Sequence, residues 1–293
     1  MTLLLVVAVL PWVLSLLLGF GADQLDRRLN PSTAVVLLPI LSMVTAFSVA
    51  ASMAALAAVL LASGEIAWLS VGIIICAWMF WRMVEVARHV RRVAVGASIA
   101  SEFGDEARAT GGIVVVDSDV PDAFAVPSGG GAVVITTGLA EALSDNELRA
   151  VVEHERAHLR HRHSVWIQMC EIAARLDPIL GPVPSKVRHA AERQADESAA
   201  TLGRRDTLSA IARTALLRKQ LDHGTRALAC TGGDVVRRVQ ALSEPPRHRR
   251  DRGILAAGLV LILAFTVIST ALFDVVQDVV APETGEVATS IFR

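Results

Sequence analysis

The chain has 293 residues, of which 53% are hydrophobic, and its formal net charge is −1 at pH 7. This near-neutral charge gives no indication of binding to nucleic acid, and we expect no direct contact with it. The three cysteines, Cys76, Cys170 and Cys230, are widely spaced, which excludes a disulfide framework and a cysteine-based zinc site.

The apolar residues gather in four long runs. Runs of about 18 or more apolar residues are typical of membrane-spanning helices. We therefore expect four spans, at about residues 2–22, 32–63, 66–81 and 253–274. No basic segment precedes the first run and further spans follow it, so we interpret it as a span and not as a cleaved signal peptide.

Clusters of arginine give these spans a direction. Arginines follow the first and third spans and precede the fourth, whereas the tail at 275–293 is mostly acidic. Because basic residues stay on the cytoplasmic side, we expect both termini outside and residues 82–252 in the cytoplasm. The sequence thus predicts a mainly α, multi-pass protein of the cell membrane, in contact with lipid, with a cytoplasmic α+β domain at 82–252.

The cytoplasmic segment begins with strand-like runs. Residues 111–117 are rich in valine, and residues 123–126 and 132–137 flank the sequence Pro-Ser-Gly-Gly-Gly. Two such runs around a glycine-rich turn predict a β-hairpin. The turn does not match a phosphate-binding loop, because no suitably placed lysine or helix follows it.

A histidine-rich helix is expected next. Ser144 and Glu147 form a Ser-x-x-Glu capping box, and no proline or glycine interrupts residues 145–163. His154 and His158 are four residues apart, so both imidazoles lie on one helical face and can bind one ion. Zinc suits two imidazoles with a carboxylate, and Glu155 is placed to take a proton from a water at the open position.

The third ligand is not adjacent to this helix. The metzincin pattern requires glycine and histidine where the chain has His161 and Ser164, so that pattern is excluded. Glu192 lies on a later predicted helix, with Asp196 one turn further on, where it could accept the second N–H of a ligand histidine. Alone, this pair of carboxylates would be interpreted as two solvated charges.

For other polar residues, the sequence gives weaker indications of a function. We expect His161 and His163 to be surface histidines in a basic helix end, with an extra ligand or proton shuttle as the alternative. His223 and Arg204 or Arg205 could stabilise an oxyanion, but the spacing selects none of them. The chain has no tyrosine, which excludes that side chain from the role.

Two segments together resemble a known family. Residues 122–163, DAFAVPSGGGAVVITTGLAEALSDNELRAVVEHERAHLRHRH, and residues 192–200, ERQADESAA, are similar to membrane-embedded gluzincin metallopeptidases. These are the antirepressor-sensor proteases of BlaR/MecR type, related to HtpX and the CAAX prenyl endopeptidases. The resemblance implies a zincin-like domain with one Zn²⁺ per chain. It implies that His154, His158 and Glu192 bind the ion, that Glu155 is the catalytic base, and that Asp196 orients a ligand histidine.

The resemblance also implies that an extended peptide pairs with the strand before the active-site helix. We expect that strand at Phe124, Ala125 and Val126 or at Ala132, Val133 and Val134. Sensor proteases of this type carry a penicillin-binding domain after the last span. Here only residues 275–293 follow it, so sensing by a fused domain is not expected.

The sequence favours a zinc-dependent endopeptidase at the membrane that cuts a regulatory protein, such as a transcriptional repressor, or a membrane protein. The alternative is a non-catalytic signalling or scaffold protein with a structural metal site. A structural zinc site is normally closed and rich in cysteine, and in it Glu155 would have no role.

Overall fold

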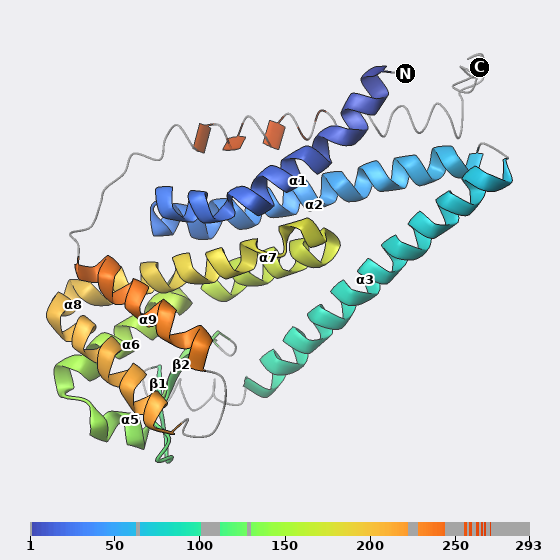
Figure 1. Ribbon diagram of the computed structural model, residues 1–293. Coiled ribbons are helices and arrows are strands. Elements are labelled where there is room, and N and C mark those ends of the chain that lie inside the picture. The colour runs from blue at the N-terminus through green and yellow to red at the C-terminus, as the bar shows by residue number, and fades with distance from the viewer. Residues whose placement is uncertain are drawn as a thin grey trace.

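The computed structural model describes residues 2–62, 65–100, 112–127, 130–221 and 228–243, and single residues between 255 and 270. Three long helices open the chain: α1 (Thr2–Arg28), α2 (Pro31–Ala62) and α3 (Ile66–Ala100). α1 and α2 lie side by side, and α3 leaves the end of α2 at an oblique angle (Figure 1).

Two helices of the described residues, α2 and α3, are long and apolar enough to cross a membrane. Within these residues the structure thus supports two of the four expected spans. α2 follows the second predicted span, whereas α3 contains the third and continues well beyond it, because no proline interrupts the residues after Trp81. α1 covers the first predicted span but has four charged residues in its last two turns. The fourth predicted span lies mostly outside the described residues.

The first two helices share a hydrophobic core with the later part of the chain. Leu18 of α1 and Leu38 of α2 pack in one cluster with residues of α7 (His163–Leu176), η2 (Pro178–Leu180) and α8 (Val183–Leu221). At the closest point, a Cβ added to Gly19 would lie 2.5 Å from the carbonyl oxygen of Ile179. The boundary at residue 82 therefore does not separate two cores, and the division into membrane and cytoplasmic domains stays a proposal.

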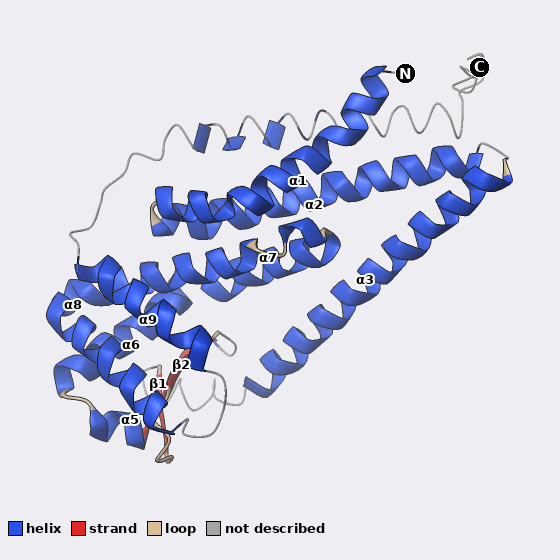
Figure 2. Cartoon of the chain, viewed as in Figure 1, coloured by secondary structure: helices blue, strands red, loops and turns tan. Residues whose placement is uncertain are grey.

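A small sheet lies at the far end of the molecule, among helices (Figure 2). Its strands are β1 (Ile113–Val116), β2 (Ala123–Val126) and β3 (Ala132–Thr136), in the order β1-β3-β2. β2 and β3 are antiparallel, with Val126 opposite Ala132, which confirms the predicted hairpin. β1 pairs with β3 in parallel. The mainly helical fold with a small sheet agrees with the expected fold class.

The remaining helices include the histidine-rich segment and the helices near it in the chain. They are α5 (Thr137–Ala142), α6 (Asp145–Arg160), α7, α8 and α9 (Leu228–Ser243). α6 packs against α8 along its length and touches β2. α8 is broken at Gly203, whose backbone is not helical. The helix predicted over residues 145–163 is in fact two helices, since α6 ends at Arg160.

Candidate metal centre

The start of α6 is held by the carboxylate of Glu147. The backbone N–H and the hydroxyl of Ser144 both donate to Glu147 Oε2, at 2.9 and 2.8 Å. From α8, the hydroxyl of Ser209 and the guanidinium of Arg213 donate to the same carboxylate. Burial opposes the charge of Glu147, but these hydrogen bonds and Arg213 outweigh it and lower its pKa to about 2. The predicted capping box therefore also clamps α6 to α8.

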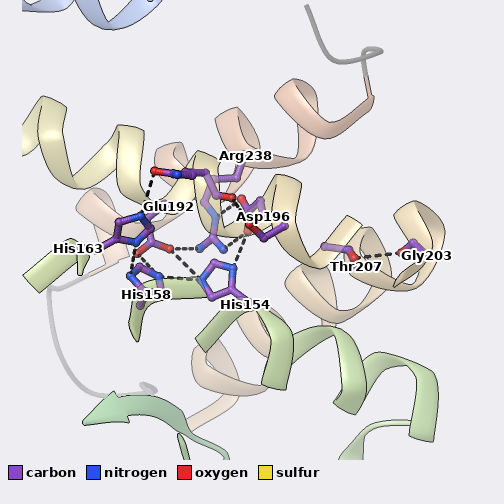
Figure 3. Close-up of polar contacts among 10 residues, drawn as sticks. His154, His158, His163, Glu192, Asp196, Gly203, Thr207 and Arg238 are labelled. Carbon is purple, nitrogen blue, oxygen red and sulfur yellow. Dashed lines mark hydrogen bonds and ion pairs between the residues drawn. The ribbon is translucent and has the colours of Figure 1, made fainter. Parts of the chain in front are cut away.

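Three donor groups converge where α6 faces α8 (Figure 3). His154 Nε2 and His158 Nε2 are 3.2 Å apart. The carboxylate of Glu192 presents Oε2 to His154 Nε2 at 3.4 Å and Oε1 to His158 Nε2 at 3.5 Å. A tetrahedral zinc ion with bonds of 2.0–2.1 Å separates its ligand atoms by about 3.3–3.4 Å. The separations are close to this value, so the three residues can hold one zinc ion and supply three of its four ligands.

Asp196 holds His154 from behind. Its Oδ1 lies 3.0 Å from His154 Nδ1, and its side chain is only 2% exposed. Because an ionised carboxylate can only accept, His154 Nδ1 carries the proton and Nε2 is directed toward the ion. Burial lowers the pKa of His154, but Asp196 and Glu192 together raise it to about 9. Metal binding must therefore release a proton from this ring.

His163 holds His158 in the same way, so the expectation of a surface histidine is wrong. It is fully buried, and its Nδ1 lies 3.0 Å from His158 Nδ1. Its Nε2 lies 3.1 Å from Gln194 Oε1, an oxygen that can only accept. His163 Nε2 therefore carries the proton, His163 Nδ1 accepts from His158, and His158 Nε2 is free to bind metal. Burial lowers the pKa of His158 to about 4 and also lowers that of His163, so both rings are neutral.

The turn between α6 and α7 allows the contact between His163 and His158. Arg162 has φ 52° and ψ 41°, in the left-handed region, and is the one non-glycine residue with positive φ in the described part of the chain. Such a conformation is costly for a side chain other than glycine and is found at functional sites. The left-handed conformation of Arg162 changes the direction of the chain, so that the side chain of His163 lies against that of His158. His161 caps α6 and stacks on His163 with ring centroids 5.7 Å apart.

Arg238 of α9 is a residue of the site that the sequence did not indicate. It donates from Nε and Nη2 to both oxygens of Asp196, at 2.8 and 2.6 Å, and its Nη1 lies 3.0 Å from Glu192 Oε2. Although burial opposes ionisation, the pKa of Glu192 is lowered to about 2 by His154, Arg238 and His158, and that of Asp196 is lowered chiefly by Arg238. Arg238 thus compensates the charge of the buried Asp196 and that of the half-buried Glu192.

One basic residue named from the sequence for an oxyanion role, Arg204, has other partners. Arg204 donates to Glu197 and to the carbonyl of Leu242, so it ties α8 to α9. His223 lies outside the described residues. Neither residue is therefore placed at the metal centre by the structure.

The strands beside α6 differ in what they can offer a peptide. β3 is paired on both sides: Val133 lies opposite Ile113 in β1 and Ala125 in β2. The expectation that Ala132, Val133 and Val134 pair with a substrate is therefore wrong, because β3 has no free edge. β2, with Phe124, Ala125 and Val126, lies at the edge of the sheet next to α6. Glu155 lies on α6 directly after His154 and is half-buried.

The sequence of this region is similar to known peptidases. Residues 81–181 match the model of Peptidase family M48. A protein named Protease HtpX homolog from Acidiphilium cryptum is 42% identical over 55 residues, which cover 18% of this chain and 19% of the relative. One of the same name from Aeropyrum pernix is 32% identical over 102 residues, which cover 32% of each chain.

The similarity is confined to part of each protein. The chain aligns with less than a third of the length of these curated relatives. No solved structure matches it. The match includes α6 with both histidines, and Glu192 follows on α8 at the position where the structure needs a third ligand. The segment that contains the His-Glu-x-x-His helix is thus similar to Peptidase family M48 and to the HtpX proteases.

Proposed function

We propose that the protein is a membrane-bound, zinc-dependent endopeptidase that holds one Zn²⁺ with His154, His158 and Glu192. The observation that carries the proposal is the convergence of their donor atoms: the two Nε2 atoms lie 3.2 Å apart, and the two carboxylate oxygens of Glu192 lie 3.4 Å from His154 Nε2 and 3.5 Å from His158 Nε2. When bound there, zinc supplies a Lewis acid that lowers the pKa of water and polarises a carbonyl group.

The side chains around the ion divide the remaining work. Glu155 accepts the proton of the attacking water and delivers it to the leaving amine. Asp196 and His163 keep the two imidazoles in the tautomers that point Nε2 at the ion. The outer edge of β2 pairs with an extended peptide and lays it along α6.

The substrate we propose is a protein segment near the membrane. α2 and α3 are candidates for crossing the bilayer, and the arginines that follow the apolar part of α3 support a cytoplasmic site. The resemblance to antirepressor-sensor proteases favours a regulatory protein, such as a transcriptional repressor. The names of the HtpX relatives identify them as proteases and leave the substrate open.

The Glu155→Gln variant tests the proposal. We expect it to keep one zinc per chain and to lose cleavage by about 100-fold or more, because general base catalysis contributes at least that factor. Zinc is measured by mass spectrometry of the purified full-length protein, and cleavage by comparing membrane proteomes of cells with either form. Glu153→Gln, two residues away and paired with Arg160, is the matched control and should retain both properties.

Two results contradict the proposal. If the wild-type protein binds no zinc at saturating metal, the proposal of a zinc-dependent hydrolase is refuted. If the Glu155→Gln variant cleaves as fast as the wild type, Glu155 is not the catalytic base. If zinc is bound but neither form cleaves any protein, the alternative of a scaffold with a structural metal is favoured.

A further inference from the structure

A second site lies between α3 and α7, formed by residues that take no part in the metal centre. A cavity of about 340 Å³ opens there. Its walls include His89 and Arg92 of α3, Gln168, Glu171 and Arg175 of α7, and Arg188 of α8. The proposed protease function uses none of these side chains.

The cavity carries a net positive charge. Among the described residues that line it, Glu171 is the one acidic group, and it accepts from both Arg175 and Arg188. These ion pairs hold two guanidinium groups in place, and Arg92 adds a third positive charge from the opposite wall. Guanidinium groups match the geometry of phosphate oxygens, which they bind through paired N–H donors. The wall chemistry therefore suits a phosphate group.

The interior of the cavity is ordered by a polar contact between its two main helices. His89 is buried, and its Nε2 lies 2.7 Å from Gln168 Oε1. Val93 and Ile167 add apolar surface to the wall. A mixed wall of this kind accommodates a charged group together with the beginning of a hydrocarbon chain.

The position of the cavity along α3 indicates a lipid. Arg82 stacks over Trp78 and Trp81, at 5.9 and 5.5 Å from their ring centroids, an arrangement typical of a membrane interface. His89 follows Arg82 by about two helical turns, or about 10 Å along the axis. A cavity at this distance beyond the interface residues can meet the headgroup layer.

We propose that this cavity binds a phosphate group, supplied by the headgroup of an anionic phospholipid. Basic pockets on the cytoplasmic side of membrane helices bind such headgroups. Bound there, the lipid joins α3 to α7, the helix whose first residue is His163. The other source of the same chemistry is free inorganic phosphate, and the experiment distinguishes the two.

The test uses the full-length protein in a neutral detergent, with native mass spectrometry and thermal unfolding as readouts. The probes are phosphatidylglycerol, phosphatidylcholine and inorganic phosphate. We expect phosphatidylglycerol to be retained at least tenfold more than phosphatidylcholine and to raise the unfolding temperature. The double variant Arg92→Gln/Arg188→Gln should lose this difference. Arg91→Gln, with the same loss of charge on α3 but outside the cavity wall, should behave like the wild type.

The outcomes separate the sources of the phosphate. Stabilisation by inorganic phosphate alone, lost in the double variant, assigns the site to free phosphate. The proposal is overturned if neither phosphatidylglycerol nor phosphate binds, or if the double variant retains lipid as well as Arg91→Gln does. If the double variant does not fold, the single change at the exposed Arg92 decides the question in the same way. Neither readout depends on protease activity.

Discussion

The two ligand imidazoles of the metal centre are supported by different partners. The carboxylate of Asp196 faces Nδ1 of His154, whereas the neutral ring of His163 faces Nδ1 of His158. A carboxylate raises the basicity of its histidine, and a neutral acceptor chiefly fixes the tautomer. Asp196 and Glu192 raise the pKa of His154 to about 9 against the effect of burial, whereas burial lowers that of His158 to about 4.

We predict that His163→Ala weakens zinc binding by about tenfold to 100-fold, because loss of a partner behind a ligand histidine has that effect. Without His163, the Nδ1 proton of His158 has no acceptor and the ring is free to turn. The affinity is measured by competition with a chromophoric zinc chelator on the full-length protein.

The control for this change is His161→Ala, which removes a histidine that stacks on His163 and not on either ligand ring. It should bind zinc within about threefold of the wild type. Equal affinities of His163→Ala and the wild type would contradict the role given to His163. Thermal unfolding of the metal-free forms separates loss of affinity from loss of fold.

At the scale of single elements, α6 is oriented by its first turn as much as by its packing. Glu147 collects donors from Ser144, Ser209 and Arg213, so one buried carboxylate fixes the start of α6 relative to α8. The alignment brings His154 and His158 to the height of Glu192. The Ser-x-x-Glu pattern predicts the cap, but the two partners on α8 follow only from the fold.

We predict that Glu147→Gln lowers the stability of the metal-free protein by about 2 kcal/mol at pH 7, since hydrogen bonds to a charged group contribute on that order. The pKa of Glu147 is about 2 in the folded state and 4.5 in its ordinary state. Its contribution is therefore complete above pH 4.5 and declines as the pH falls toward 2.

Thermal unfolding between pH 7 and pH 3 measures this effect. The gap between wild type and Glu147→Gln should be largest at pH 7 and narrow below pH 4.5. Glu153→Gln, which removes a carboxylate paired with the exposed Arg160, should change the unfolding temperature little at any pH. A gap that stays constant or widens in acid would show that the charge of Glu147 is not the cause.

At the scale of the whole molecule, local patterns predicted the elements better than their partners. The period of His154 and His158 and the glycine-rich turn before Ala132 determine a helix and a hairpin within a few residues. Arg238 could not be found in this way, because it reaches Asp196 from a separate helix 42 positions later. The left-handed Arg162 has no sequence signal either, since burial of His163 stabilises it from outside the turn.

Hydropathy also did not predict whether the long helices contact lipid or other parts of the protein. The apolar side of a helix is stabilised to a similar extent by contact with lipid and by contact with protein. Composition alone therefore does not show that α1 and α2 pack against α7, η2 and α8. The contact of Gly19 with η2 is a consequence of this shared core. It depends on the absence of a side chain at one position.

We predict that Gly19→Ala destabilises the protein by about 1–3 kcal/mol, because the new Cβ would meet the backbone of Ile179. The matched control is Gly21→Ala on the same helix, where nothing lies within 4 Å of an added Cβ. This control should be neutral or slightly stabilising, since alanine favours helix. Thermal unfolding in detergent compares them, and equal effects would contradict the close packing of α1 on η2.

Zinc X-ray absorption of the purified Glu155→Gln protein tests the central claim most directly, because it reads the atoms bound to the ion. The account predicts a shell of nitrogen and oxygen only, at about 2.0–2.1 Å, with the multiple scattering of two imidazoles and a total of four ligands. Changing Glu192 to Gln should remove or reorganise this shell. A sulfur scatterer near 2.3 Å, or a shell that is unchanged without the Glu192 carboxylate, would contradict it.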